Sequence, residues 1–218
     1  SPLKLEQVQW TLREGDQNLS PSPVLEGVQI PPLRVIGQMS NGYVVVEGPA
    51  ELYLIDQHAA HERIRFERIK LQREKQQVEV QGLLEPMTIE LDARQEQLLK
   101  SVGEVLAGFG FSIEPFGYRT YLMRAVPAVI TGQDIAQVVT EILDSPHETG
   151  AIARWEEKIA ISLACHGAVR AGQTLTQKEM VELVRQLEQT ALPRTCPHGR
   201  PTLLHLSLSH LAREFGRT

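Results

Sequence analysis

A short segment rich in acidic residues and histidine, lying directly behind an apolar run, most constrains how this chain folds. The run ELYLI at residues 51–55 is typical of a strand, and DQHAAHERIRFE at 56–67 predicts the start of a helix. Asp56 stands where a helix N-cap belongs, because its carboxylate can accept hydrogen bonds from the first amides of the helix. His58 and Glu62 are four residues apart and project from one helix face. The junction therefore presents half of a metal site.

Few residues elsewhere in the sequence have side chains that could complete this site. Cys165 lies in the segment SLACHGAVRAG, and Cys196 and His198 are one residue apart in CPHGRP. Thiolate, imidazole and carboxylate together favour zinc, and they admit manganese at an oxygen-rich second position. On spacing alone, two other interpretations stay open, namely a structural Cys165 buried in a helix and an incidental Cys196 in a turn.

The order of residues in the helix excludes one familiar zinc site. Zinc-protease helices carry His-Glu-x-x-His or His-x-x-Glu-His, whereas this helix carries His58-Ala-Ala-His61-Glu62. We therefore expect His61 at the surface. The basic residues of the same helix alternate with acidic ones, which favours a solvated, salt-bridged face. Those basic residues are Arg63, Arg68, Lys70 and Arg73.

Composition favours a soluble globular protein with a proper core. The chain has 218 residues, of which 42% are hydrophobic, enough for one large domain or two small ones. It has no apolar run near the roughly 20 residues of a membrane span, and no signal-peptide pattern. Two cysteines do not make a disulfide framework, although a single disulfide stays possible. The net charge of −5 argues against strong nucleic-acid binding by this domain alone.

The first third of the sequence predicts a polar tail and then a β-meander. Residues 1–29 are expected to form a linker or disordered tail. Three short β-branched runs follow, divided by Asn41-Gly42 and Gly48-Pro49, and Asn-Gly between apolar runs is a strong hairpin signal. The meander leads into a helix expected at 57–76.

The remaining sequence alternates between strand and helix patterns. Asp92 predicts a helix N-cap, and Thr176 with Glu179 predicts a capping box. The fold class expected is α+β (mixed α/β), with a small antiparallel sheet and helices plus an inserted α/β lobe. The further elements expected are strands at 81–91, 111–117, 120–128 and 202–207, and helices at 92–107, 133–143, 153–165, 175–187 and 209–215.

The helix motif resembles a known family. Asp56-Gln57-His58-Ala59, then Glu62 after two residues and Glu67 after four more, resembles the endonuclease motif of the MutL family of DNA mismatch-repair proteins. The likeness is to the C-terminal dimerisation and nicking domain, and it covers nearly the whole chain after residue 30. The segments Ala164-Cys165, Cys196–Pro201 and Phe215-Gly216-Arg217 match further family elements. His166 departs from the basic residue that the family usually carries there.

The resemblance implies roles for individual residues. Asp56, Glu62 and Glu67 are implied to be acidic residues needed for nicking. Asp56 alternatively completes a metal shell, orients His58 or only caps the helix. Glu67 points roughly 140° around the helix from Glu62, so a structural salt bridge is its alternative. Arg200 and Arg217 are candidates for phosphate contacts, and a turn-stabilising role is the alternative for Arg200. The implied metal ligands are His58, Glu62, Cys165, Cys196 and His198.

A second short motif resembles the sliding-clamp-binding peptide of bacterial MutL proteins. It consists of Gln81, Leu83, Leu84 and Pro86. An extended peptide with a buried Gln and two apolar anchors can dock in a hydrophobic groove. The alternative is a strand that enters the inserted lobe with both leucines in its core.

The family layout implies an interrupted dimerisation sub-domain at 30–79 and 155–218, with an external regulatory sub-domain at 80–154. The implied cofactors are Zn²⁺ in a regulatory or structural role and Mn²⁺ in catalysis, with ATP used only through an N-terminal domain outside this sequence. A homodimer, duplex DNA and the replication sliding clamp are implied partners, as is the mismatch-recognition protein MutS through the full-length protein. No membrane partner is expected, and the implied location is cytoplasmic and nucleoid-associated.

The function predicted is therefore a metal-dependent DNA-nicking endonuclease that also homodimerises and nicks weakly as an isolated domain. One alternative is a non-catalytic dimerisation and clamp-binding module with a structural zinc. Another is a metal hydrolase whose substrate is not DNA. A symmetric dimer needs an exposed apolar face, for which the early strands supply candidates. These are Val35, Ile36, Val44, Val45, Val46, Leu52 and Leu54.

Overall fold

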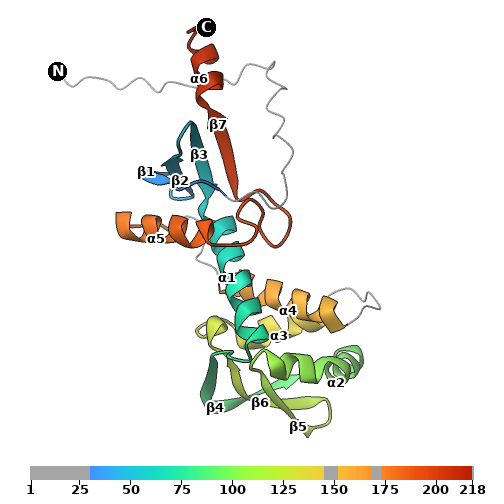
Figure 1. Ribbon diagram of the computed structural model, residues 1–218. Helices are drawn as coiled ribbons and strands as arrows, with labels where there is room; N and C mark the ends of the chain where they lie inside the picture. The colour runs from blue at the N-terminus through green and yellow to red at the C-terminus, as the bar shows by residue number, and fades with distance from the viewer. Residues whose placement is uncertain (1–29, 145–151, 168–172, 218) are drawn as a thin grey trace, which may run out of the picture.

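Two small sheets stand at opposite ends of an elongated molecule, and one long helix runs between them (Figure 1). The computed structural model describes residues 30–144, 152–167 and 173–217. The expected tail at 1–29 lies outside these residues. The architecture is α+β, as the sequence predicts.

The first sheet begins with the predicted meander. Its strands β1 (Arg34–Met39), β2 (Tyr43–Glu47) and β3 (Glu51–Asp56) are antiparallel neighbours. The connection between β1 and β2 places Ser40 and Asn41 at φ values of 50° and 51°. Asn tolerates this left-handed backbone better than most residues, which explains why Asn-Gly marks the turn.

The end of the chain completes this sheet. Strand β7 (Leu203–Ser207) pairs antiparallel with β3, so Leu54 lies opposite Leu204, and the strand order is β1-β2-β3-β7. The short helix α6 (Leu208–Glu214) then extends beyond the sheet (Figure 1). Segments far apart in the sequence thereby form one layer.

Two helices cover one face of the first sheet. Helix α1 (Gln57–Glu74) follows β3 directly, and α5 (Gln177–Glu188) packs against the sheet and α1. The capping box that Thr176 and Glu179 form begins α5 as predicted. The first core consists of Ile30, Val44, Val46, Tyr53, Ile55, Ala60, Leu175, Met180, Leu183, Val184, Leu187 and Leu203.

The second sheet has the order β4-β6-β5 and is also antiparallel. Its strands are β4 (Val80–Glu90), β5 (Ser112–Gly117) and β6 (Thr120–Pro127). Helix α2 (Ala93–Gly108) connects β4 to β5 and starts at the predicted cap, Asp92. Strand β4 is an edge strand, which leaves one of its sides unpaired.

Three further helical segments surround a second core. They are the 3₁₀ turn η1 (Ala128–Ile130) and the helices α3 (Ile135–Asp144) and α4 (Ile152–His166). Phe66 and Ile69 of α1 belong to this core, together with four residues of α4. Helix α1 therefore contributes to both cores. The sub-domain boundaries at 79/80 and 154/155 stay predictions. Among the described residues, no helix has both the length and the apolarity to cross a membrane.

Candidate metal centre

The junction between β3 and α1 is built as the sequence predicts. Asp56 has an extended backbone, and its Oδ1 atom accepts a hydrogen bond from the amide of Ala59 at 2.9 Å. The backbone amide of Asp56 donates to the carbonyl of Thr202 at 2.8 Å, which fixes the start of the helix to the segment before β7. Asp56 is therefore the N-cap of α1, and the cap ties the helix to the chain's last third.

His58 and Glu62 meet on one face of α1. The Nε2 atom of His58 lies 3.2 Å from Oε1 of Glu62, whose side chain is only 3% exposed. A carboxylate this deeply buried needs charged or hydrogen-bonding neighbours. Glu62 finds further ones on its other oxygen, because Oε2 lies 3.5 Å from Nδ1 of His198 and 3.2 Å from Nη2 of Arg200.

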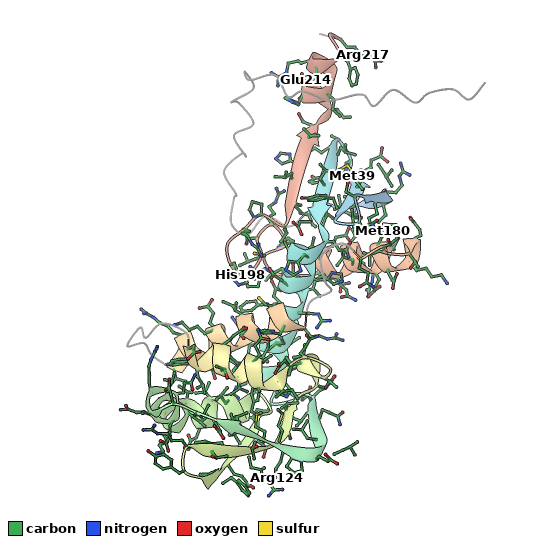
Figure 2. All side chains as sticks on the ribbon, turned by 180° about the vertical axis from the view of Figure 1, so that it is seen from behind. Met39, Arg124, Met180, His198, Glu214 and Arg217 are labelled. Atoms are coloured by element: carbon green, nitrogen blue, oxygen red, sulfur yellow. The ribbon has the colours of Figure 1, made fainter. Side chains whose placement is uncertain are left out.

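Three candidate ligands from distant parts of the chain converge at this point. The ligand atoms of Glu62, Cys165 and His198 all lie within 4.8 Å of one another. Cys165 comes from the last turn of α4, and its Sγ atom lies 3.6 Å from Nε2 of His198. Figure 2 shows His198 in the loop beside the start of α1, between the first sheet and α4.

The CPHGRP segment holds His198 in a tight turn. The amide of Gly199 donates to the carbonyl of Cys196 at 2.9 Å, and the amide of Cys196 donates to the carbonyl of Arg200 at 2.8 Å. Gly199 has a φ of +79°, which is easy only for glycine. The turn thereby directs the His198 ring at Glu62 and Cys165.

The other two predicted ligands lie beside this cluster. His58 reaches it through its contact with Glu62, and Cys196 is buried underneath. Arg200 has a raised pKa because its guanidinium is hydrogen-bonded to Cys196 and is close to the Glu62 carboxylate. Burial raises the pKa of the Cys165 thiol to about 12, and the Glu62 carboxylate adds to this effect. The thiol is therefore protonated at neutral pH, and binding of a metal there would release a proton.

The donor set fits a divalent metal such as zinc. A tetrahedral zinc with bonds of about 2.3 Å to sulfur and about 2.0 Å to nitrogen keeps its ligand atoms about 3.5 Å apart. The separation of 3.6 Å between Cys165 and His198 agrees with this value. One carboxylate, one thiol and one imidazole in mutual reach are the ligand types that zinc prefers. His58 and Cys196 stand next to them as additional donors.

Glu67 lies on a different side of α1 from the cluster, and its contacts are structural. Its carboxylate accepts hydrogen bonds from the amides of Ala191 and Leu192, and it lies 3.7 Å from Nη1 of Arg63. These bonds attach the loop after α5 to α1. Whether Glu67 also takes part in nicking stays a prediction.

The two arginines predicted to contact phosphate are placed very differently. Arg200 lies at the cluster through its contact with Glu62. Arg217 lies beyond α6, where its guanidinium sits 6.0 Å from the ring of Phe215. Figure 2 shows Arg217 at the far tip of the molecule, well away from His198. This chain alone therefore does not bring Arg217 to the candidate metal centre.

One expectation about α1 was wrong. Arg63 is buried, not solvated, and its Nε atom donates to the carbonyl of Thr195. It thereby anchors the loop that carries His198, a role that sequence reasoning missed because charged residues are usually exposed. His61 is partly buried, and its Nδ1 atom is hydrogen-bonded to the carbonyl of Gln57 at 2.9 Å.

Three of the predicted clamp-binding residues lie in a bulge of the edge strand β4, whereas Gln81 pairs with Val126 just before it. Gly82 pairs with Ala125 and Met87 pairs with Met123, so the residues between them outnumber those of the facing strand. Leu84 is fully exposed within this bulge, whereas Leu83 packs against the second core. The predicted motif residues within the strand are Gln81, Leu83, Leu84 and Pro86.

Comparison with known proteins agrees with the resemblance to the MutL family. Residues 36–175 match the family described as the MutL C terminal dimerisation domain. The DNA mismatch repair protein MutL of Koribacter versatilis is 38% identical over 188 residues, which cover 85% of this chain and 29% of that protein. The MutL of Geotalea daltonii is 37% identical over 201 residues, covering 91% of this chain and 34% of its own length.

A third relative is similar to this chain to the same extent. The MutL of Symbiobacterium thermophilum is 38% identical over 208 residues, which cover 93% of this chain and 33% of that protein. The chain spans about a third of the length of these relatives. With its α+β fold and the family match over most of its length, the chain belongs to the MutL family, within that family's C-terminal dimerisation domain.

Proposed function

We propose that this chain is a metal-dependent endonuclease domain that nicks duplex DNA. The observation that carries the proposal is the convergence of Glu62, Cys165 and His198, whose ligand atoms lie within 4.8 Å of one another. Arg200 adds a cation at the same carboxylate, and its own side chain is 61% exposed, so it can also be reached from solvent. The guanidinium is suited to hold a phosphate at the centre.

The chemistry is hydrolysis of a phosphodiester bond. A divalent metal, when bound, supplies a water that is deprotonated near neutral pH and positive charge for the leaving oxygen. Glu62 holds the centre together, since its two oxygens face His58 on one side and His198 on the other. Arg200 positions the phosphate, and Asp56 adds negative charge at the end of α1 where His58 lies.

The Asp56→Asn variant tests the proposal sharply. Asn is as good an N-cap as Asp, so the variant keeps the start of α1 and removes only the negative charge. We expect unchanged folding and metal content, with nicking of supercoiled plasmid lost in the presence of Mn²⁺. In Glu62→Gln we expect both metal binding and nicking to be lost. Wild-type nicking by Asp56→Asn would remove Asp56 from the mechanism.

The same variants separate this function from its two rivals. If the chain binds zinc tightly but neither it nor its full-length parent nicks plasmid with any divalent metal, the cluster is structural. If it hydrolyses small phosphodiesters or peptides and leaves plasmid intact, the substrate is not DNA. Metal content measured alongside Cys196→Ala shows whether the buried thiol belongs to the ligand set.

We further propose that two copies of the chain pair through the first sheet. The supporting observation is an apolar sheet face turned away from α1 and α5, on which Leu204 is 55% exposed. Val44 and Val46, which were among the candidates for this face, are completely buried in the first core instead. The register places the following residues together on the outward face: Val45, Leu52, Leu54, Leu204 and Leu206.

A second binding function is favoured by the bulge in β4. Leu84 is an apolar side chain with no neighbours to cover it, in an edge strand whose backbone is free to accept a partner. We propose that the bulge docks on the replication sliding clamp, with Leu84 as the apolar anchor. Leu83 holds the bulge to the second core.

A further inference from the structure

A groove runs along α1 on the side next to the metal centre. Six residues of α1 line it, and the four polar ones are spaced at intervals of four, three and four residues, so they form one stripe on the helix. These are His61, Arg65, Arg68 and Gln72. The opposite walls come from η1, α4 and α5, and the groove encloses about 370 Å³. We call it the α1 groove.

The positive charges of the α1 groove lack the partners that other α1 arginines have. Arg63 pairs with Glu67, and Arg73 pairs with Glu156 at 3.0 Å. Within the described part of the chain, neither Arg65 nor Arg68 has a carboxylate within ion-pair distance.

The α1 groove contains one carboxylate, and it lies at the end away from the metal centre. Glu79 lines the groove there and accepts a hydrogen bond from Nε2 of Gln72 at 3.4 Å. The middle of the groove is therefore positive, although the chain as a whole carries a net charge of −5.

The surroundings of Arg65 disfavour its positive charge. Burial lowers the pKa of Arg65, and the nearby charge of Arg68 lowers it further. A bound anion would remove this repulsion, because it supplies the missing opposite charge.

The α1 groove and the metal centre are both built on helices α1 and α4. His61 is the residue before Glu62, and Leu163, which lines the groove from α4, is two residues before Cys165. Arg65 lies against the end of α4, where a Cβ atom on Gly167 would come within 2.2 Å of its Nη1 atom. The groove therefore passes close to the end of α4 that carries Cys165.

We propose that the α1 groove holds the sugar–phosphate backbone of the DNA strand and leads it to the metal centre. This inference rests on the proposed nicking function and adds the surface that binds the substrate. The stripe from His61 to Gln72 spans about 16 Å at 1.5 Å per residue, which is long enough to follow more than one phosphate of a strand. A single small anion would occupy only the space between Arg65 and Arg68.

The test measures DNA binding separately from nicking. A labelled duplex of about 20 base pairs is titrated with the complete 218-residue chain between about 20 and 200 mM salt. The variant Arg68→Gln removes one charge from the groove, and Lys70→Gln removes one from the other side of the same helix. Both residues are exposed, so neither change disturbs the core. Arg65→Lys keeps its charge and serves as a conservative comparison.

We expect Arg68→Gln to lower the slope of log affinity against log salt by about 1, because one phosphate contact is lost. Lys70→Gln and Arg65→Lys should keep the wild-type slope, and metal content should be unchanged in all three. Equal slopes for wild type and Arg68→Gln would overturn the proposal. Saturable binding of inorganic phosphate that Arg68→Gln abolishes, without any effect on duplex binding, would also overturn it in favour of a small-anion site.

The nicking function can fail independently of this inference. If Glu62→Gln abolishes nicking while Arg68→Gln binds duplex normally, the endonuclease stands and the α1 groove is not its DNA track. If Arg68→Gln changes the slope but no metal supports nicking, the groove binds DNA for a non-catalytic protein.

Discussion

The carboxylate of Glu67 accepts a hydrogen bond from the backbone amide of Ala191 at 2.7 Å, although the two residues are 124 positions apart in the sequence. The neighbouring amide of Leu192 donates to the same carboxylate at 3.2 Å. These bonds fix the start of the loop that carries Cys196 and His198. A residue that the family motif connects with nicking thus has a structural task in this chain.

We predict that Glu67→Ala lowers the free energy of unfolding by about 1–3 kcal/mol, because it removes two hydrogen bonds to a charged group and the ion-pair partner of the buried Arg63. Metal affinity should fall as well, since the loop is less firmly held. Glu67→Gln keeps an acceptor oxygen and should lose less stability. Urea unfolding and zinc titration provide the measurements, with the exposed Glu74→Gln as a control on the same helix. Wild-type stability and metal binding in Glu67→Ala, with nicking lost, would instead assign Glu67 to the chemistry.

In the bulge of β4, we predict that one leucine controls clamp binding and its neighbour controls the stability of the fold. Leu84→Ala should weaken binding to a purified sliding clamp by about tenfold or more, as expected of an apolar anchor, without changing the unfolding midpoint. Leu83→Ala should lower the midpoint, because Leu83 packs on the second core. Surface plasmon resonance and thermal unfolding measure the two effects. Undiminished clamp binding by Leu84→Ala would contradict the docking proposal.

The outward face of the first sheet predicts the oligomeric state. Leu204→Asp places a charge in the middle of the apolar face, and we expect light scattering to show a monomer where the wild type is a dimer. Leu71→Asp makes the same change at an exposed position of α1 and should leave the dimer intact. A dimer that survives Leu204→Asp would exclude this face as the interface.

Tyr53 predicts a loss of stability at alkaline pH. Burial and the neighbouring Glu51 raise its pKa to about 12, and its hydroxyl donates to Glu51 at 2.5 Å, with Arg194 and His205 also nearby. The unfolded phenol titrates near 10, so the stabilisation is complete below about pH 10 and is lost as pH rises toward 12.

Tyr53→Phe has no phenol to ionise and should lose less stability over this interval than the wild type. Urea unfolding midpoints measured between pH 9 and pH 11.5 show how much stability each of the two proteins loses as tyrosine ionises. Parallel curves would show that Tyr53 does not control the alkaline transition.

The local elements could be predicted because their signals are local. Asn41-Gly42 marks the first hairpin, Asp56 and Asp92 cap their helices, and all three are found where the sequence places them. It was harder to predict which side of a strand faces the core. Val44 and Val46 point inward and Val45 outward, but a run of three valines carries no alternation from which to choose.

The site required information that spacing does not contain. Nothing in the residues alone places β7 beside β3 or brings His198 to Glu62, and the expectation of a shared site came from the resemblance to the MutL family. Arg65 and Arg68 show the opposite case. Their spacing along α1 was visible in the sequence, but whether a carboxylate of the described residues pairs with them depends on which residues the fold places opposite them.

Helix α1 links the two halves of the molecule mechanically, because it contributes residues to both cores. Near one end it carries Glu62, and further along it carries Phe66 and Ile69, which anchor the second sheet. A protein bound at the bulge in β4 would be connected through the second core and α1 to the candidate metal centre. Binding at β4 would then also set the orientation of the candidate metal centre, because α1 is one continuous helix.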